Sequence, residues 1–216
     1  LNLNSFTTDC SKDVRRAFID LKKQGASKFI LDLRENGGGS LSEAIDIINM
    51  WVPKGVTLVE TKGKLKEANR AYVTRMEPVD TVMPLVVLVN ENTASASEIM
   101  AGALQDNDRG LVVGRRSFGK GLVQKQIYLP DSSAIRLTIA RYYTPSHRCI
   151  QKDYTLGDED DYSKELYDRY SHGELYSADS IHFADSLKCY TLRRHRVVYG
   201  GGGIMPDFFV PLDTTQ

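Results

Sequence analysis

The sequence lacks an excess of charge of either sign. Among its 216 residues, 28 are Lys or Arg and 28 are Asp or Glu, so the formal net charge at pH 7 is zero. Proteins that bind nucleic acid or anionic membranes through bulk electrostatics carry a basic excess. We therefore expect no nucleic-acid partner, and we interpret the short basic run "RRHR" (193–196) as a charged strand edge.

Long hydrophobic runs are also absent. Apolar stretches such as "PLVVLV" (84–89) have the length of a strand, whereas a membrane-spanning helix needs about 20 apolar residues. We expect no membrane span in this chain. It shows no signal peptide and begins "LNLNSF", without Met and in a segment expected to be extended, so we expect a processed or trimmed piece.

Cysteine is scarce. Cys10, Cys149 and Cys189 lie far apart and form no C-x-x-C pair, which argues against a zinc site or a disulfide scaffold. Free thiols that pack as small apolar groups are the simplest expectation. A bridge from Cys149 to Cys10 or to Cys189 stays open for an oxidising compartment.

The patterns that are present predict an α/β protein. With 41% hydrophobic and 26% charged residues, the chain can bury the core of one domain plus a small appendage. Apolar spacing and apolar runs predict helices and strands in alternation, followed by two paired strands that alternate polar and apolar residues. The expected helices are 12–24, 41–52 and a third ending near 105; the expected strands are 28–34, 55–61, 84–90, 110–114, 122–129 and 134–144. This order favours a mixed-sheet α/β core with added antiparallel strands.

Composition divides the chain into three parts. Residues 1–151 form the expected core, and 152–192 form a polar, Tyr-rich excursion with one or two short helices. Residues 193–216 are expected to pass through a glycine-rich turn and return to the core as an extended segment.

The segment "VNENTASASEIMAGALQD" (89–106) follows a buried strand and opens a helix. Ser95 and Glu98 match the S-x-x-E capping box, which alone is a sufficient structural explanation for both. The box also fixes Ser95 at a helix N-terminus, where unpaired N–H groups such as that of Ala96 can stabilise an oxyanion. Ser97 lies further round the helix and is not expected to share this role.

A second oxyanion donor is available in "LDLRENGGGS" (31–40), a strand that ends in three glycines. Glycine permits backbone shapes closed to other residues, so the N–H of Gly38 or Gly39 is a candidate. Glycine-rich strand ends also hold phosphates, but the Lys-Ser/Thr pair of a P-loop does not follow here.

The base for Ser95 is the harder question. Four histidines lie late in the chain and none has a local context that recommends it, although a Ser-His-Asp triad stays open because triads are spatial. Lys120, in "SFGKGLVQ", is flanked by glycines, and Gln124 four residues on would share its face in extended chain. A lysine acts as a base only when neutral, which requires burial to lower an amine pKa from about 10.4 by roughly 3 units. An ordinary surface lysine is the simpler alternative.

Taken together, four segments resemble the C-terminal processing, or tail-specific, serine proteases: residues 29–39, 84–124, 137–151 and 201–211. The resemblance implies a core of the ClpP/crotonase type and a Ser/Lys dyad that needs no metal or cofactor. Matched along the motifs, the implied roles are nucleophile for Ser95, general base for Lys120, lysine-positioning for Gln124, a supporting role for Asp106, and an oxyanion hole made by Ala96 with Gly38 or Gly39.

The chain also departs from that family. Gly37 stands where the family usually has proline, and the PDZ domain and helical segment that usually precede the core are not in these residues. The resemblance implies protein or peptide substrates cleaved near their C-termini, a PDZ domain in the full-length protein, and a bacterial envelope or periplasmic location. A homo-oligomer stays open, as do two other functions: a non-catalytic peptide-binding scaffold on the same fold, and an acyl-CoA enzyme of the crotonase type.

Overall fold

The computed structural model describes residues 1–155 and 159–214, apart from the side chains of residues 159–163. The described helices are α1 (Cys10–Lys23), α2 (Leu41–Ile48), α3 (Ala96–Asp106) and α4 (Glu159–Ser171), with short 3₁₀ turns η1 (Lys66–Ala68), η2 (Ala178–Ser180) and η3 (Asp185–Leu187). The strands are β1 (Phe29–Asp32), β2 (Thr57–Lys62), β3 (Arg70–Val73), β4 (Leu85–Val89), β5 (Leu111–Gly114), β6 (Leu122–Tyr128), β7 (Ala134–Tyr143), β8 (Lys188–Tyr190), β9 (Val197–Tyr199) and β10 (Phe208–Phe209).

The first sheet is parallel and has the order β1-β4-β5-β10. Leu31 pairs with Val87, and Val87 with Val112, so apolar side chains form rows across its inner face. Because the strands are parallel, the segments that follow β1, β4 and β5 all leave from the same edge. The glycine run, the Ser95 segment and the Lys120 segment are therefore brought to one end of the sheet.

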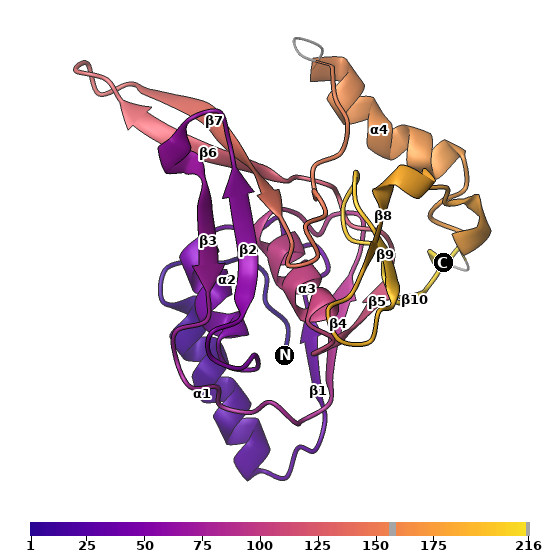
Figure 1. Ribbon diagram of the computed structural model, residues 1–216. Coiled ribbons are helices and arrows are strands. Elements are labelled where there is room, and N and C mark those ends of the chain that lie inside the picture. The colour runs from indigo at the N-terminus through magenta and orange to yellow at the C-terminus, as the bar shows by residue number, and fades with distance from the viewer. Residues whose placement is uncertain (156–158, 215–216) are drawn as a thin grey trace.

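The second sheet is antiparallel, with the order β3-β2-β7-β6 (Figure 1). Strands β6 and β7 extend beyond it as a two-stranded arm that projects from the body of the molecule. The predicted α/β class is confirmed: the parallel strands form one sheet, and the antiparallel strands form the second sheet and a separate β8-β9 pair.

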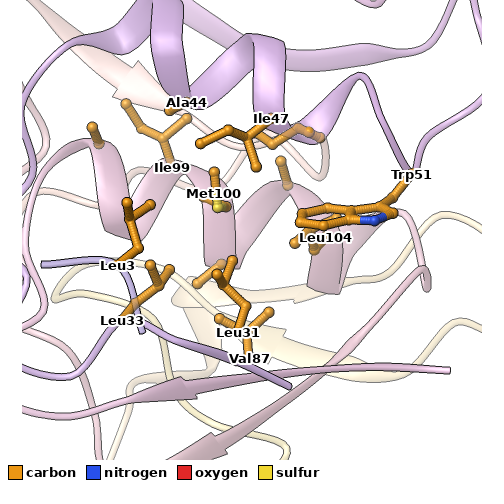
Figure 2. Close-up of a cluster of buried hydrophobic side chains, with 14 of the residues drawn as sticks. Leu3, Leu31, Leu33, Ala44, Ile47, Trp51, Val87, Ile99, Met100 and Leu104 are labelled. Atoms are coloured by element: carbon orange, nitrogen blue, oxygen red, sulfur yellow. The ribbon is translucent and has the colours of Figure 1, made fainter. Parts of the chain in front are cut away.

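Helix α3 lies between the two sheets, where it contacts β5 and β2. All eleven of its residues are buried. Met100 and Leu104 of α3 pack with Leu31 and Val87 of the parallel sheet and with Trp51 near the end of α2 (Figure 2). A helix buried on all sides has no mobile solvent face, so its first turn is held firmly where it meets the strand ends.

Three details differ from the sequence-based expectations or decide between them. The run 193–196 lies in the connection between β8 and β9, so the strand-edge interpretation of "RRHR" is wrong. Strand β8 was not predicted, because three residues of a polar segment carry too little pattern. All three cysteines are free, so neither bridge is formed.

Within the described residues, no helix is long and apolar enough to cross a membrane.

Candidate active site

The turn between β4 and α3 presents Ser95 in an unusual conformation. Ser95 is the N-cap of α3 with φ 59° and ψ −116°, a positive φ that a residue with a side chain adopts at a cost of about 1–3 kcal/mol. Two backbone contacts hold the turn: the Ser95 N–H donates to Glu98 Oε2 at 2.8 Å, and the Ala94 N–H donates to Asn36 O at 3.0 Å. Strain retained at a half-buried serine is typical of functional sites.

The second serine of the segment faces the protein interior. Ser97 is fully buried, and its hydroxyl donates to Asn36 O at 3.0 Å. Ser97 therefore ties α3 to the segment after β1, and only Ser95 is accessible from solvent.

The glycine run packs directly against this turn. Gly38 has φ 102°, and a Cβ placed on it would lie 2.8 Å from both Ala94 O and Ser95 Cβ. Only glycine fits such an approach. A Cβ placed on Gly37 would meet no atom within 4 Å, so this position has room for a larger residue.

The amides near Ser95 differ in what they bind. The Gly38 N–H donates to Asn36 Oδ1 at 2.9 Å and is already engaged. For Ala96 and Gly39, no hydrogen bond from the backbone N–H to an acceptor is found among the described residues. Of the candidate oxyanion amides, those of Ala96 and Gly39 are therefore unengaged among the described residues, and that of Gly38 is not.

The lysine loop, residues 115–121, joins β5 to β6 and carries Lys120. Close packing leaves little room for a side chain at the two glycines that flank Lys120. A Cβ on Gly119 would lie 3.1 Å from Lys152 Cβ, and one on Gly121 would lie 2.5 Å from Gln151 N. The Gly121 N–H also donates to Gln151 Oε1 at 2.9 Å. The backbone around half-buried Lys120 is consequently fixed on both sides.

One buried carboxylate joins the two segments. Glu98 is fully buried; its Oε2 accepts from the N–H groups of Ser95 and Lys120, both at 2.8 Å, and its Oε1 accepts from Ser117 Oγ and the Gly119 N–H, both at 2.6 Å. The backbone nitrogens of Ser95 and Lys120 therefore lie within two hydrogen-bond lengths of each other. Burial raises the pKa of Glu98, and these four hydrogen bonds act in the opposite direction.

Sequence reasoning missed this role of Glu98. The capping box explains its contact with Ser95, but the contacts with residues 117–120 connect positions far apart in sequence. The available signal is an acid placed in a helix of small and apolar residues, since a fully buried glutamate requires several hydrogen-bond partners.

The side chains of the expected dyad are not hydrogen-bonded to each other. Among the described residues, no hydrogen bond joins Ser95 Oγ to Lys120 Nζ. Gln124 is exposed and pairs with Thr138 on β7. The shared-face argument assumed an extended strand through both Lys120 and Gln124, but β6 begins at Leu122, so Lys120 lies in the loop before it. The structure thus brings Ser95, Ala96, Gly38, Gly39 and Lys120 together and leaves Gln124 on the adjoining strand.

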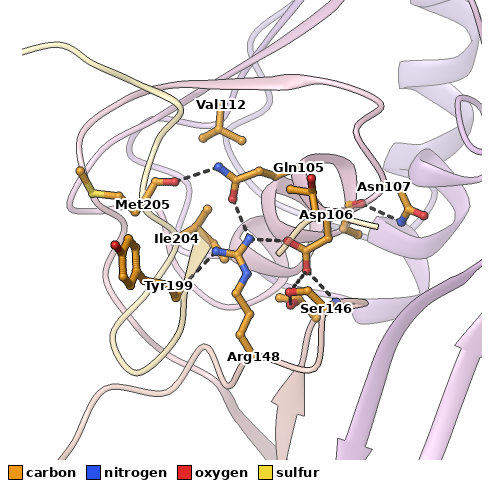
Figure 3. Close-up of polar contacts among 12 residues, drawn as sticks. Gln105, Asp106, Asn107, Val112, Ser146, Arg148, Tyr199, Ile204 and Met205 are labelled. Carbon is orange, nitrogen blue, oxygen red and sulfur yellow. Dashed lines mark hydrogen bonds and ion pairs between the residues drawn. The ribbon is translucent and has the colours of Figure 1, made fainter. Parts of the chain in front are cut away.

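Asp106 lies at the opposite end of α3, about 15 Å along the helix axis from Ser95. Its carboxylate pairs with Arg148 Nη2 at 2.7 Å and accepts from the N–H and hydroxyl of Ser146 at 3.0 and 2.7 Å (Figure 3). Gln105 accepts from the same guanidinium at 2.6 Å. This buried cluster fixes the chain after β7 to α3 and does not touch the Ser95 segment.

Comparison with known proteins agrees with this geometry. The family model described as Peptidase family S41 matches residues 1–162, three quarters of the chain. The chain belongs to peptidase family S41. It is 45% identical over 159 residues to the carboxyl-terminal-processing protease of Synechocystis sp., and the match covers 74% of this chain and 36% of that protein. It is 43% identical over 155 residues to carboxyl-terminal-processing peptidase 2, chloroplastic, of Arabidopsis thaliana, and this match covers 70% of this chain and 29% of that protein.

A solved structure supports the same family. The photosystem II D1 C-terminal processing protease superposes with a TM-score of 0.67 and 31% identity, covering 97% of this chain and 41% of that one. The chain therefore spans about a third of the length of the curated relatives it matches.

Proposed function

We propose that this chain is the catalytic core of a serine endopeptidase in which Ser95 is the nucleophile and Lys120 the general base. The observation that carries the proposal is the shared Glu98 carboxylate, which holds the backbones of Ser95 and Lys120 at one site. A strained, half-buried serine, a lysine on an adjacent fixed loop and unengaged amides form the set that acyl transfer requires.

In the proposed reaction, neutral Lys120 takes the hydroxyl proton of Ser95 as Oγ attacks the scissile carbonyl carbon. The Ala96 N–H and a glycine amide, Gly39 or Gly38, stabilise the resulting oxyanion. Lys120 returns the proton to the leaving amine, and an acyl-enzyme forms. Water, deprotonated by Lys120, then attacks the acyl carbon and releases the new carboxylate and Ser95.

Two further residues take supporting roles in this proposal. Gln124 positions the Lys120 amine once the side chains engage, and Asp106 acts at a distance by holding the far end of α3 through Arg148. No step requires a metal or cofactor.

The proposed substrates are proteins processed near their C-termini, as the names of the relatives state for those proteins. The proposal includes a PDZ domain in the full-length protein, a bacterial envelope or periplasmic location, and the option of a homo-oligomer.

The test uses the full-length protein with a fluorescently labelled unfolded protein as substrate and a fluorophosphonate as the serine-reactive probe. Ser95→Ala and Lys120→Ala should abolish cleavage, and Ser95→Ala should abolish labelling. Ser97→Ala is the matched control: it loses one buried hydrogen bond, about 1 kcal/mol, and should retain activity.

Contrary results would select another function. No cleavage and no labelling of the wild type would favour a peptide-binding scaffold on the same fold. Turnover of acyl-CoA thioesters that depends on this site would favour a crotonase-type enzyme.

A further inference from the structure

Helix α4 contacts the lysine loop through a buried arginine. Arg169 is only 4% exposed, and its two terminal nitrogens donate to consecutive carbonyls of the loop: Nη2 to Arg116 O at 2.8 Å and Nη1 to Ser117 O at 3.0 Å. Arg169 lies beyond residues 1–162, the part of the chain that the family model matches.

The position of Arg169 is fixed from behind by acidic side chains. Its Nε donates to Glu174 Oε2 at 3.3 Å, and Arg116 Nη1 donates to the same carboxylate oxygen at 3.1 Å. Glu165, one turn earlier on α4, accepts from Lys152 Nζ at 2.9 Å. The Lys152 ammonium also lies 4.2 Å from the ring centroid of Phe118 in the lysine loop. Helix α4 is therefore tied to the loop by two separate cationic contacts.

Ser117 connects the two ends of this arrangement. Its carbonyl accepts from Arg169, and its hydroxyl donates to Glu98, the carboxylate that also binds the Ser95 and Lys120 amides. The lysine loop is thus held by a buried arginine acting on its carbonyls and a buried acid acting on its amides. A planar guanidinium suits two adjacent carbonyls, whereas a lysine ammonium presents a single point charge.

We propose that Arg169 is a positioning residue for Lys120: by fixing the carbonyls of residues 116 and 117, it sets the direction in which the lysine loop presents its amine to Ser95. Arg169 touches no reacting atom. The inference rests on the proposed peptidase function, and it extends the machinery of the site to a helix outside the matched part of the chain.

The first test measures kcat and KM separately in the full-length protein. Arg169→Lys keeps the charge but loses the paired donors, so kcat should fall about tenfold to a hundredfold, because small displacements of catalytic groups are costly. KM should stay within about threefold, since substrate binding is not altered. The matched control is Lys164→Met on the exposed side of α4, which should leave both parameters unchanged.

A chemical rescue distinguishes positioning from general support. In Arg169→Ala, added methylguanidinium should restore a part of kcat and methylammonium should not, because only the former reproduces the paired donors. Equal effects of the two compounds, or an unchanged kcat in Arg169→Lys, would overturn the proposal.

A third measurement does not depend on activity. Hydrogen exchange at the amides of Gly119 and Lys120 should be faster in Arg169→Lys, with exchange in α1 unchanged. Unchanged protection at residues 119 and 120, or faster exchange throughout the protein, would overturn the positioning role. Cleavage activity that survives in the Ser95→Ala variant would instead refute the proposed function, so the two failures are distinguishable.

Discussion

Replacing Glu98 by glutamine tests whether one buried carboxylate holds the candidate dyad together. Glu98→Gln preserves the size of the side chain but converts one acceptor oxygen into an NH₂ donor. All four partners of the carboxylate currently donate: three backbone N–H groups and the Ser117 hydroxyl. The amide must therefore place its NH₂ against at least one of these donors.

The geometry shows which orientation the amide should prefer. With NH₂ at the Oε2 position, both the Ser95 and Lys120 N–H groups lose their acceptor. With NH₂ at the Oε1 position, the Ser117 oxygen, which already accepts from the Ile204 N–H, can also accept from the amide. The Gly119 N–H and the Ser117 hydroxyl proton then lose their acceptor. The second orientation gives the NH₂ group a partner but leaves these two buried donors unsatisfied, at about 1–3 kcal/mol each. The remaining bonds are weakened because they lose their charged acceptor.

We therefore expect Glu98→Gln to lower the free energy of unfolding by about 2–6 kcal/mol, out of the about 5–15 kcal/mol typical of a folded domain. The variant should fold, and kcat should fall about a hundredfold because the lysine loop moves relative to Ser95. Glu98→Ala removes both acceptor oxygens, leaves all four donors unpaired and should fail to fold.

The assay combines denaturant unfolding with steady-state kinetics on the full-length protein. Glu98→Asp provides a second comparison: it keeps the charge but cannot reach all four donors, so it should also lose activity. Wild-type kcat in Glu98→Gln would refute the idea that this carboxylate positions the two segments.

The glycine run and the Asp80 carboxylate provide two further tests. Gly38→Ala should reduce kcat about a hundredfold or more, because its Cβ would meet Ala94 O and Ser95 Cβ at 2.8 Å, whereas Gly37→Ala, with open space around it, should retain wild-type rates. Asp80→Asn should destabilise the fold at pH 7 by at most about 2 kcal/mol. Burial raises the pKa of Asp80, but hydrogen bonds from Lys22 and from the Met83 and Val82 amides outweigh burial and lower the pKa to about 2. The figure is an upper bound because Lys22 is half-exposed, so solvent partly screens its charge. A carboxyl group whose pKa is lower in the folded state stabilises the fold at pH values above its pKa in the unfolded chain, about 3.9. The difference in free energy of unfolding between wild type and variant, measured with denaturant, should therefore shrink as the pH falls from about 4 towards 2. A constant difference over this range would contradict the assignment.

The sequence predicted those parts of the molecule that local pattern determines. The buried strand before Asn90 and the capping signal at Ser95 are local features, so the turn and the start of α3 could be placed. The two positive-φ glycines after β1 followed from the same logic, since consecutive glycines at a strand end indicate a backbone that other residues cannot adopt.

Long-range contacts and local irregularities were not predictable in the same way. Glu98 meets residues 117–120 only because β4 and β5 are neighbours in a parallel sheet, and no periodicity reports that pairing. Lys120 lies in the loop before β6, so the strand alternation on which its shared face with Gln124 depended does not extend to it. The role of Asp106 was equally hidden, because its partner Arg148 is more than 40 residues away.

In the proposed dyad, the backbones of Ser95 and Lys120 are held in place, whereas their side chains still have to meet. The Ser95 and Lys120 amides share one oxygen of Glu98, which holds the two backbones at one site. Lysine has a flexible four-carbon stem, and rotation about its side-chain bonds can bring Nζ towards Ser95 Oγ while every anchor of the loop remains in place. Within the proposed mechanism, the rotamer of Lys120 is therefore what separates the held backbones from an engaged pair.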